Sequence, residues 1–196
     1  GGAVYLFGGG QATSVSTVVR VDPATGAART VGHMDEPLSD LGAVVVGGKA
    51  YLIGGYTSVK FASAVLRWNG GGKTTTVARL PAGTRYAGVA VLGSTIYVAG
   101  GLLPSGPSDA VLALGVHGGV HRVATLPAPQ DHSALVALGG RLYLVGGTRI
   151  LRIDPSGAVT VAGKLPAALT DPAAVAIGNR IVIVGGGTSS VYAFTP

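Results

Sequence analysis

One motif recurs five times along the chain: a short apolar stretch that runs into two consecutive glycines. The copies VYLFGG, AYLIGG, IYVAGG, LYLVGG and IVIVGG end at Gly9, Gly55, Gly101, Gly147 and Gly186. Their first glycines are 46, 46, 46 and 39 residues apart. Because the motif runs from one end of the chain to the other without a linker, we expect one domain over residues 1–196.

Each repeat resolves into four predicted strands, named A to D in chain order. In the second repeat they cover residues 42–46, 50–53, 64–68 and 74–78. The A-to-B turns use pairs such as Gly47-Gly48, which reach positive φ at low cost in two-residue hairpins. Strand B is apolar at consecutive positions, which indicates that both of its faces are covered. A strand-bearing period of about 40 to 50 residues is typical of β-propeller blades, and stacked blades cover both faces of each sheet.

Two more features recur in register with the diglycine. An aromatic residue stands three positions before it at Tyr5, Tyr51, Tyr97 and Tyr143. A Leu-Pro pair precedes strand A at Leu80-Pro81, Leu126-Pro127 and Leu165-Pro166. With the diglycine, these features make the chain resemble kelch repeats over essentially its whole length. The resemblance implies an all-β fold, a β-propeller of kelch-like four-stranded blades. The chain departs from the kelch pattern in lacking the usual strand-D tryptophan, since its one Trp, Trp68, lies in strand C.

The first and last repeats are incomplete, whereas the three between them are complete. Gly1 aligns with Gly47 inside an A-to-B turn, and Pro196 aligns with Pro155 at a C-to-D turn. The first repeat therefore lacks strand A and the fifth lacks strand D. Because open sheet edges invite association, we expect a fragment of a larger propeller whose edges pair with the missing parent segment or with another chain. The alternative is a five-bladed propeller with two strands supplied elsewhere or absent.

Composition excludes several classes of function. The chain has no cysteine, so disulfides, thiolate chemistry and cysteine-ligated metals are excluded. The formal net charge is +6, but the Lys and Arg residues are spread singly without interleaved aromatics, so we expect no nucleic-acid partner. The apolar runs are about strand length, which predicts no transmembrane segment. The Ala-, Val- and Gly-rich composition resembles that of GC-rich bacteria, whose propellers are often extracytoplasmic, either secreted or membrane-attached through a removed segment.

Polar residues recur fourteen positions before the first glycine of each later diglycine, at Asp40, Tyr86, His132 and Asp171. Matched register places equivalent residues around one channel, and in kelch proteins the D-to-A and B-to-C loops form the usual binding face. With their neighbours, these residues predict a ligand-binding rim of Asp40, Arg85, Tyr86, Asp131, His132, Asp171 and Arg149. An equally good interpretation is that these entry loops are merely solvated and need capping residues.

The acids concentrate on the same loops, which hold Asp35, Glu36, Asp40, Asp131 and Asp171. This predicts an acidic mouth suited to a cationic, hydroxylated or basic-peptide ligand. Lys49, Arg141 and Arg180 follow the A-to-B turns and predict a basic opposite end.

Catalytic and metal-binding patterns are sparse. The sequence Asp131-His132-Ser133 holds all three triad residue types, but neighbours on a strand point to alternate faces and cannot form a triad together. The remaining histidines, His33, His117 and His121, lie in or beside turns and are expected to be solvated. No spacing is typical of zinc, and a copper radical site of the galactose oxidase kind needs an absent cysteine. We therefore predict no catalytic residue, no metal and no cofactor.

The sequence favours a non-catalytic binding, interaction or sensor module that binds a protein or a carbohydrate through the rim. The alternative is a sugar-processing enzyme, an isomerase similar to sialic-acid mutarotases or a lyase, that uses His132 with an Asp as acid and base.

Overall fold

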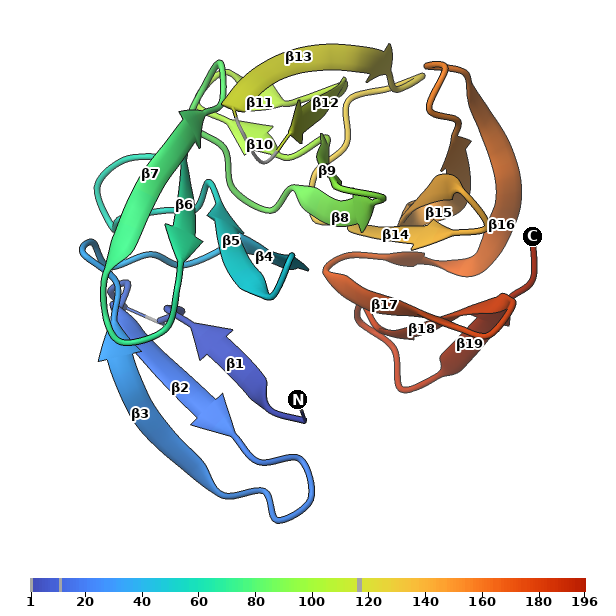
Figure 1. Cartoon of the computed structure of the whole chain (residues 1–196). Coiled ribbons are helices and arrows are strands. Elements are labelled where there is room, and N and C mark those ends of the chain that lie inside the picture. Colours follow the sequence, from blue (N-terminus) through green and yellow to red (C-terminus); the bar gives the residue numbers. More distant parts are fainter. Residues whose placement is uncertain (1, 11, 116–117) are drawn as a thin grey trace. The chain divides into compact units, whose positions relative to one another are not determined.

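The computed structural model describes residues 2–10, 12–115 and 118–196 (Figure 1). Gly1, with the turn predicted around it, and His117, predicted to be solvated, lie outside the described residues. The described residues form 19 strands and no helix, so the all-β prediction is confirmed. They divide into two compact units, Gly1–Arg85 and Tyr86–Pro196, called here the N-terminal and the C-terminal unit.

The N-terminal unit contains two antiparallel sheets. The first has the order β1-β2-β3, with β1 (Val4–Phe7), β2 (Thr17–Val21) and β3 (Ala28–His33). The second has the order β4-β5-β6-β7, with β4 (Gly42–Val46), β5 (Lys49–Ile53), β6 (Ala64–Trp68) and β7 (Thr74–Arg79). The first sheet is thus a B-C-D sheet and the second a complete A-B-C-D sheet, as the repeat predicts.

The C-terminal unit contains three larger sheets and a small hairpin. The first sheet joins β8 (Gly88–Leu92), β9 (Thr95–Ala99), β12 (Ala110–Gly115) and β13 (Gly118–Thr125), and its B-to-C loop carries β10 (Leu102–Leu103) and β11 (Gly106–Pro107). The next joins β14 (Ala134–Leu138), β15 (Arg141–Ile153) and β16 (Val159–Leu169). The last joins β17 (Pro172–Ile177), β18 (Arg180–Gly185) and β19 (Val191–Phe194), an A-B-C sheet. His121 lies within β13, so its predicted place beside a turn is wrong, although its side chain is exposed.

The element β15 supplies two strands rather than one. A straight strand of its 13 residues would be about 43 Å long. Nevertheless, Nε of Arg141, its first residue, lies 2.9 Å from Oδ1 of Asp154, which follows its last residue. Leu144 and Leu151 also pack into one cluster. The chain therefore turns back inside β15, and its two arms are strands B and C of a complete four-stranded repeat with a very short B-to-C loop.

In the first three repeats the diglycine holds the sheet against the connection that leads to the next one. A Cβ on Gly54 would lie 2.4 Å from the carbonyl oxygen of Thr84, and one on Gly100 would lie 2.1 Å from that of Gln130. The second glycines, Gly55 and Gly101, donate their N–H groups to these same carbonyls at 2.7 and 2.9 Å. No side chain larger than hydrogen fits such an approach, which explains the first glycine of the motif in these repeats.

The core lies between neighbouring sheets within each unit. In the N-terminal unit Trp68 packs against Tyr5 and Phe7, with ring centroids 5.2 and 5.3 Å apart. In the C-terminal unit Tyr143 on β15 contacts Phe194 on β19 at 6.1 Å. Sheets are therefore covered face to face, as the apolar B strands predict.

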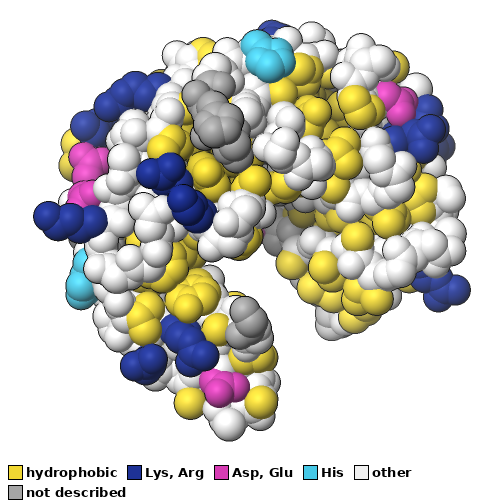
Figure 2. Space-filling view, in the orientation of Figure 1, with side chains coloured by type: hydrophobic (Ala, Val, Ile, Leu, Met, Phe, Trp, Pro, Cys, Tyr) yellow, Lys and Arg dark blue, Asp and Glu magenta, His cyan; other side chains and the backbone are white. Residues whose placement is uncertain are grey.

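Apolar side chains also gather over β17, β18 and β19 on the visible surface (Figure 2). Val175 is 54% exposed and Val191 is 67% exposed. The other face of this sheet packs against β14 and β15 through Ile181 and Ile183. The last sheet is therefore apolar on both faces, like the sheets that precede it.

Candidate functional site

The four residues predicted from the repeat register share one rare backbone conformation. Asp40, Tyr86, His132 and Asp171 have φ values of 54°, 54°, 51° and 56°. Aspartate and histidine are enriched in this left-handed region, whereas a bulky Tyr adopts it at a cost. Backbone outliers of this kind concentrate at functional sites, so Tyr86 is the most informative of the four positions.

The backbone of these residues links the sheets of the C-terminal unit. The N–H of His132 donates to the carbonyl of Tyr86 at 3.1 Å, and the N–H of Asp171 donates to the carbonyl of His132 at 3.0 Å. This ladder explains the shared left-handed turn as a structural device. It does not explain why the side chains are an aromatic ring and an imidazole, because glycine or asparagine would adopt the turn more easily.

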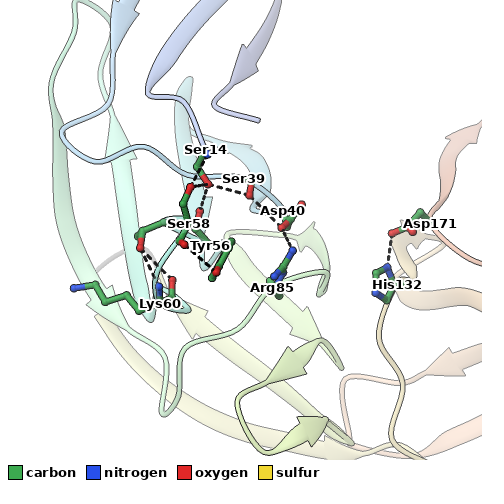
Figure 3. A network of polar contacts seen from close by, with 10 residues as sticks. Ser14, Ser39, Asp40, Tyr56, Ser58, Lys60, Arg85, His132 and Asp171 are labelled. Atoms are coloured by element: carbon green, nitrogen blue, oxygen red, sulfur yellow. Dashed lines mark hydrogen bonds and ion pairs between the residues drawn. The ribbon is translucent and has the colours of Figure 1, made fainter. Parts of the chain in front are cut away.

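The side chains of the same three residues are also in contact. The rings of Tyr86 and His132 are stacked, with centroids 3.8 Å apart and planes 25° apart. His132 Nδ1 lies 2.8 Å from Oδ1 of Asp171 (Figure 3). Because a carboxylate only accepts, Nδ1 donates this bond, and Nε2 is the accepting nitrogen of the neutral ring. An oriented imidazole of this kind can accept a proton or a hydroxyl hydrogen bond.

A pocket of about 500 Å³ lies beside the imidazole, wholly within the C-terminal unit. It is lined by Pro127, Ala128, Pro129, Gln130, Asp131, His132, Gly146, Gly147, Thr148, Arg149, Leu151, Leu169 and Thr170. Three predicted rim residues, Asp131, His132 and Arg149, thus share one cavity. Proline and leucine side chains form its apolar walls, and carboxylate, amide, hydroxyl and guanidinium groups provide both donors and acceptors.

The hydroxyl of Ser133 forms hydrogen bonds with groups other than the imidazole of His132. It donates to the carbonyl of its neighbour Asp131 at 2.9 Å and accepts from Nε2 of Gln130 at 2.8 Å. It makes no described bond to His132. The three adjacent residues do not form a triad, but the reason given from the sequence is wrong, because they precede β14 instead of lying on a strand and His132 has a φ of 51°.

Arg149 stands directly opposite Lys164 in the β15–β16 ladder. Like charges at such a position are destabilising. Among the described residues neither side chain has an ion-pair partner. The rim of the pocket is therefore locally cationic beside Arg149, within the mouth that the sequence predicts to be acidic overall.

The N-terminal unit holds the remaining predicted residues, Asp40 and Arg85, and pairs them with each other (Figure 3). Their side chains are 21% and 19% exposed. The guanidinium carbon of Arg85 also lies 4.5 Å from the ring centroid of Tyr56 and 5.5 Å from that of Phe61. Asp40 is thus engaged in an ion pair and Asp171 in a hydrogen bond with His132, and neither contributes an isolated carboxylate.

A cluster of serine hydroxyls next to this pair was not predicted from the sequence. Ser14 Oγ donates to the carbonyl of Tyr56 at 2.7 Å and lies 3.1 Å from Ser58 Oγ and 3.2 Å from Ser39 Oγ. Ser39 Oγ in turn donates to Asp40 Oδ2 at 3.1 Å. The sequence did contain one signal for this cluster. Tyr56 and Ser58 follow the second diglycine, in a B-to-C loop, and these loops are predicted to form part of the binding face. The cluster satisfies its own donors, so it rigidifies the loops.

Neither a metal centre nor a membrane span emerges from the described residues. No group of three or more His, Cys, Asp or Glu in this part of the chain could hold a metal ion. No helix within residues 2–10, 12–115 and 118–196 is long and apolar enough to cross a bilayer.

Comparison with known proteins identifies the fold. No protein-family model matches the chain, and no curated protein matches it. Together with the repeated antiparallel sheets, a match among solved structures shows a β-propeller of kelch-like four-stranded blades, with five repeats of which three are complete. That solved structure is YjhT, which is 18% identical, has a TM-score of 0.84, and matches over 100% of this chain and 77% of its own. Membership of the kelch family itself stays a prediction.

Proposed function

We propose that the chain binds a carbohydrate in the pocket of the C-terminal unit. The observation that carries the proposal is the convergence of three predicted rim residues, Asp131, His132 and Arg149, on one cavity of about 500 Å³. Small-molecule sites commonly have such a volume, with apolar walls and a few placed polar groups.

The chemistry of the lining suits a polyhydroxylated ligand. The Asp131 carboxylate accepts from hydroxyls, Arg149 donates to them, and the hydroxyls of Thr148 and Thr170 do both. Leu151 and the two prolines offer apolar surface to ring C–H groups. Arg149, with Lys164 opposite it, also favours ligands that bear an acidic group. A sugar presents hydroxyls and C–H faces together, which a purely apolar ligand does not.

The proposal is tested by a glycan array followed by titration calorimetry with the best-bound sugar. Asp131→Asn and Arg149→Gln should each weaken binding by about tenfold or more, since a hydrogen bond to a charged group is lost. Asp109→Asn is the matched control, because Asp109 pairs with Arg122 and does not line the pocket. Full affinity in both pocket variants would rule the site out.

A sugar-processing enzyme is the second candidate, favoured by the hydrogen bond between His132 and Asp171. Asp171 orients the imidazole, and His132 lines the pocket where a sugar hydroxyl would lie. Such a pair can act as a general base on the anomeric hydroxyl proton, which is the first step of ring opening, or on a C–H proton beside a carboxyl group, which is the first step of elimination. One-dimensional NMR of sugars incubated with the protein would reveal accelerated anomer exchange or new products, and His132→Asn should abolish them. Absence of turnover for every sugar that binds would leave the binding function alone.

A further inference from the structure

A second groove, of about 420 Å³, lies in the N-terminal unit and contains none of the predicted rim residues. Its floor includes Leu66 and Thr76, which stand opposite each other in the β6–β7 ladder. Four ionisable residues line it: Asp35, Glu36, Lys60 and Arg79. The groove therefore combines an uncharged floor with both signs of charge.

The acidic and the basic residues of the groove lie near opposite ends of β7. Thr74, the first residue of the strand, donates from Oγ1 to Asp35 Oδ2 at 3.0 Å. Arg79 is the last residue of the strand. Five residues of strand separate the backbones of Thr74 and Arg79 by about 16 Å. The N–H of Leu80 donates to the carbonyl of Ser63 at 2.8 Å, so the loop that carries Lys60 approaches the Arg79 end.

The opposite charges do not neutralise each other across the groove. Within the described part of the chain, no ion pair involves Asp35, Glu36, Lys60 or Arg79. Asp35, Glu36, Lys60 and Arg79 are all exposed side chains. A ligand that carries a cation and an anion about 16 Å apart would satisfy both ends at once.

We propose that this groove binds an extended peptide segment with a basic residue at one end and an acidic residue about five positions away. An extended chain rises about 3.3 Å per residue, so five positions match the length of β7. The hydroxyl groups of Thr74 and Thr76 give such a peptide hydrogen-bonding partners along the groove. The site lies outside the carbohydrate pocket and does not depend on it.

The test uses fluorescein-labelled, end-capped peptides and fluorescence anisotropy. The reference peptide is Lys-Thr-Ser-Thr-Ser-Glu, and it is compared with versions that replace Lys or Glu by Gln and with the short peptide Lys-Thr-Glu. Each neutralised end should weaken binding by about fivefold, the upper range for an exposed ion pair. The short peptide should bind as weakly as a peptide with one neutral end, since it cannot reach both charges.

Charge reversal in the protein makes the test independent of folding defects. The variant Asp35→Lys with Glu36→Lys should prefer a peptide with Glu at both ends, and Arg79→Glu with Lys60→Glu should prefer one with Lys at both ends. Lys49→Glu, at the start of β5 and outside the groove, should keep the preference of the unmodified protein. Equal affinity for all peptides, or variants that keep the original preference, would overturn the proposal.

Discussion

The ring of Tyr86 lies on the imidazole of His132, with 3.8 Å between centroids, although 46 positions separate them in the repeat. Both residues occupy the same left-handed backbone position of consecutive repeats. The stack and the bond from His132 to Asp171 fix the imidazole from two sides. A residue held this firmly has its orientation set before a ligand arrives, which favours affinity.

The left-handed conformation of His132 predicts which of two substitutions at this position lowers the stability of the protein more. His132→Asn and His132→Val both remove the stack and the bond to Asp171, but only Asn tolerates positive φ. The Val variant should therefore be less stable than the Asn variant by about 1–3 kcal/mol. Urea unfolding followed by circular dichroism measures the difference.

The matched control for this prediction is His121, which is exposed in the middle of β13. In a strand Val should be preferred to Asn, the reverse of the order at His132, because β-branched residues fit a pleated sheet better than asparagine does. His121→Val should then be at least as stable as His121→Asn. The same order at both positions would show that backbone conformation is not the cause.

The close approach at the diglycine predicts a large cost for one added methyl group. Gly100 and Gly93 have nearly equal φ values, 64° and 63°, but a Cβ on Gly93 would meet nothing within 4 Å. Gly93→Ala should lose about 1–2 kcal/mol of unfolding free energy, the cost of the left-handed region alone. Gly100→Ala should lose about 1–3 kcal/mol more, because its Cβ would collide with the carbonyl of Gln130. Similar losses in chemical denaturation would contradict the steric role of the motif.

The strand pattern could be predicted from the sequence because it depends on local chemistry that repeats. In the second repeat, the predicted strands at 42–46 and 64–68 coincide with β4 and β6, while β5 and β7 are each one residue longer than predicted. Turn glycines and consecutive apolar residues signal these elements directly. The spacing of 39 residues before the last diglycine shows that this repeat is shorter, but spacing alone does not predict the fold-back inside β15.

The repeat register could predict which candidate residues share a backbone position, but not what their side chains contact. Register identified Asp40 and His132, because equivalent positions follow from counting. It could not show that Arg85 neutralises Asp40, or that Arg149 faces Lys164 across β15 and β16. Those contacts depend on loop paths and strand pairing that no local pattern encodes. The acidic mouth was therefore overestimated from charge counts alone.

Trp68 provides a prediction about a buried polar atom. Its indole Nε1 is buried and has no hydrogen-bond partner among the described residues. Trp68→Phe removes this donor, whose burial costs about 1–3 kcal/mol, and keeps an aromatic ring against Phe7. Its stability should change by less than about 1.5 kcal/mol, whereas Trp68→Ala should lose about 3–5 kcal/mol. Equal losses for the two variants would mean that the indole N–H is satisfied in solution.

The ion pair between Arg85 and Asp40 should stabilise the folded protein more than the more exposed pair between Arg141 and Asp154 does. In the first pair the side chains are 19% and 21% exposed, and in the second 49% and 21%. A double-mutant cycle with Asp40→Asn, which keeps the left-handed backbone, and Arg85→Met, which keeps the stem on Tyr56, isolates the charge interaction. Burial reduces screening, so the coupling should fall within about 0.5–3 kcal/mol and exceed that of Arg141→Met with Asp154→Asn, which should stay below about 1 kcal/mol. If the two couplings were equal at 0.15 M salt and fell equally at 1 M salt, the Arg85 pair would be as open to solvent as an ordinary surface pair.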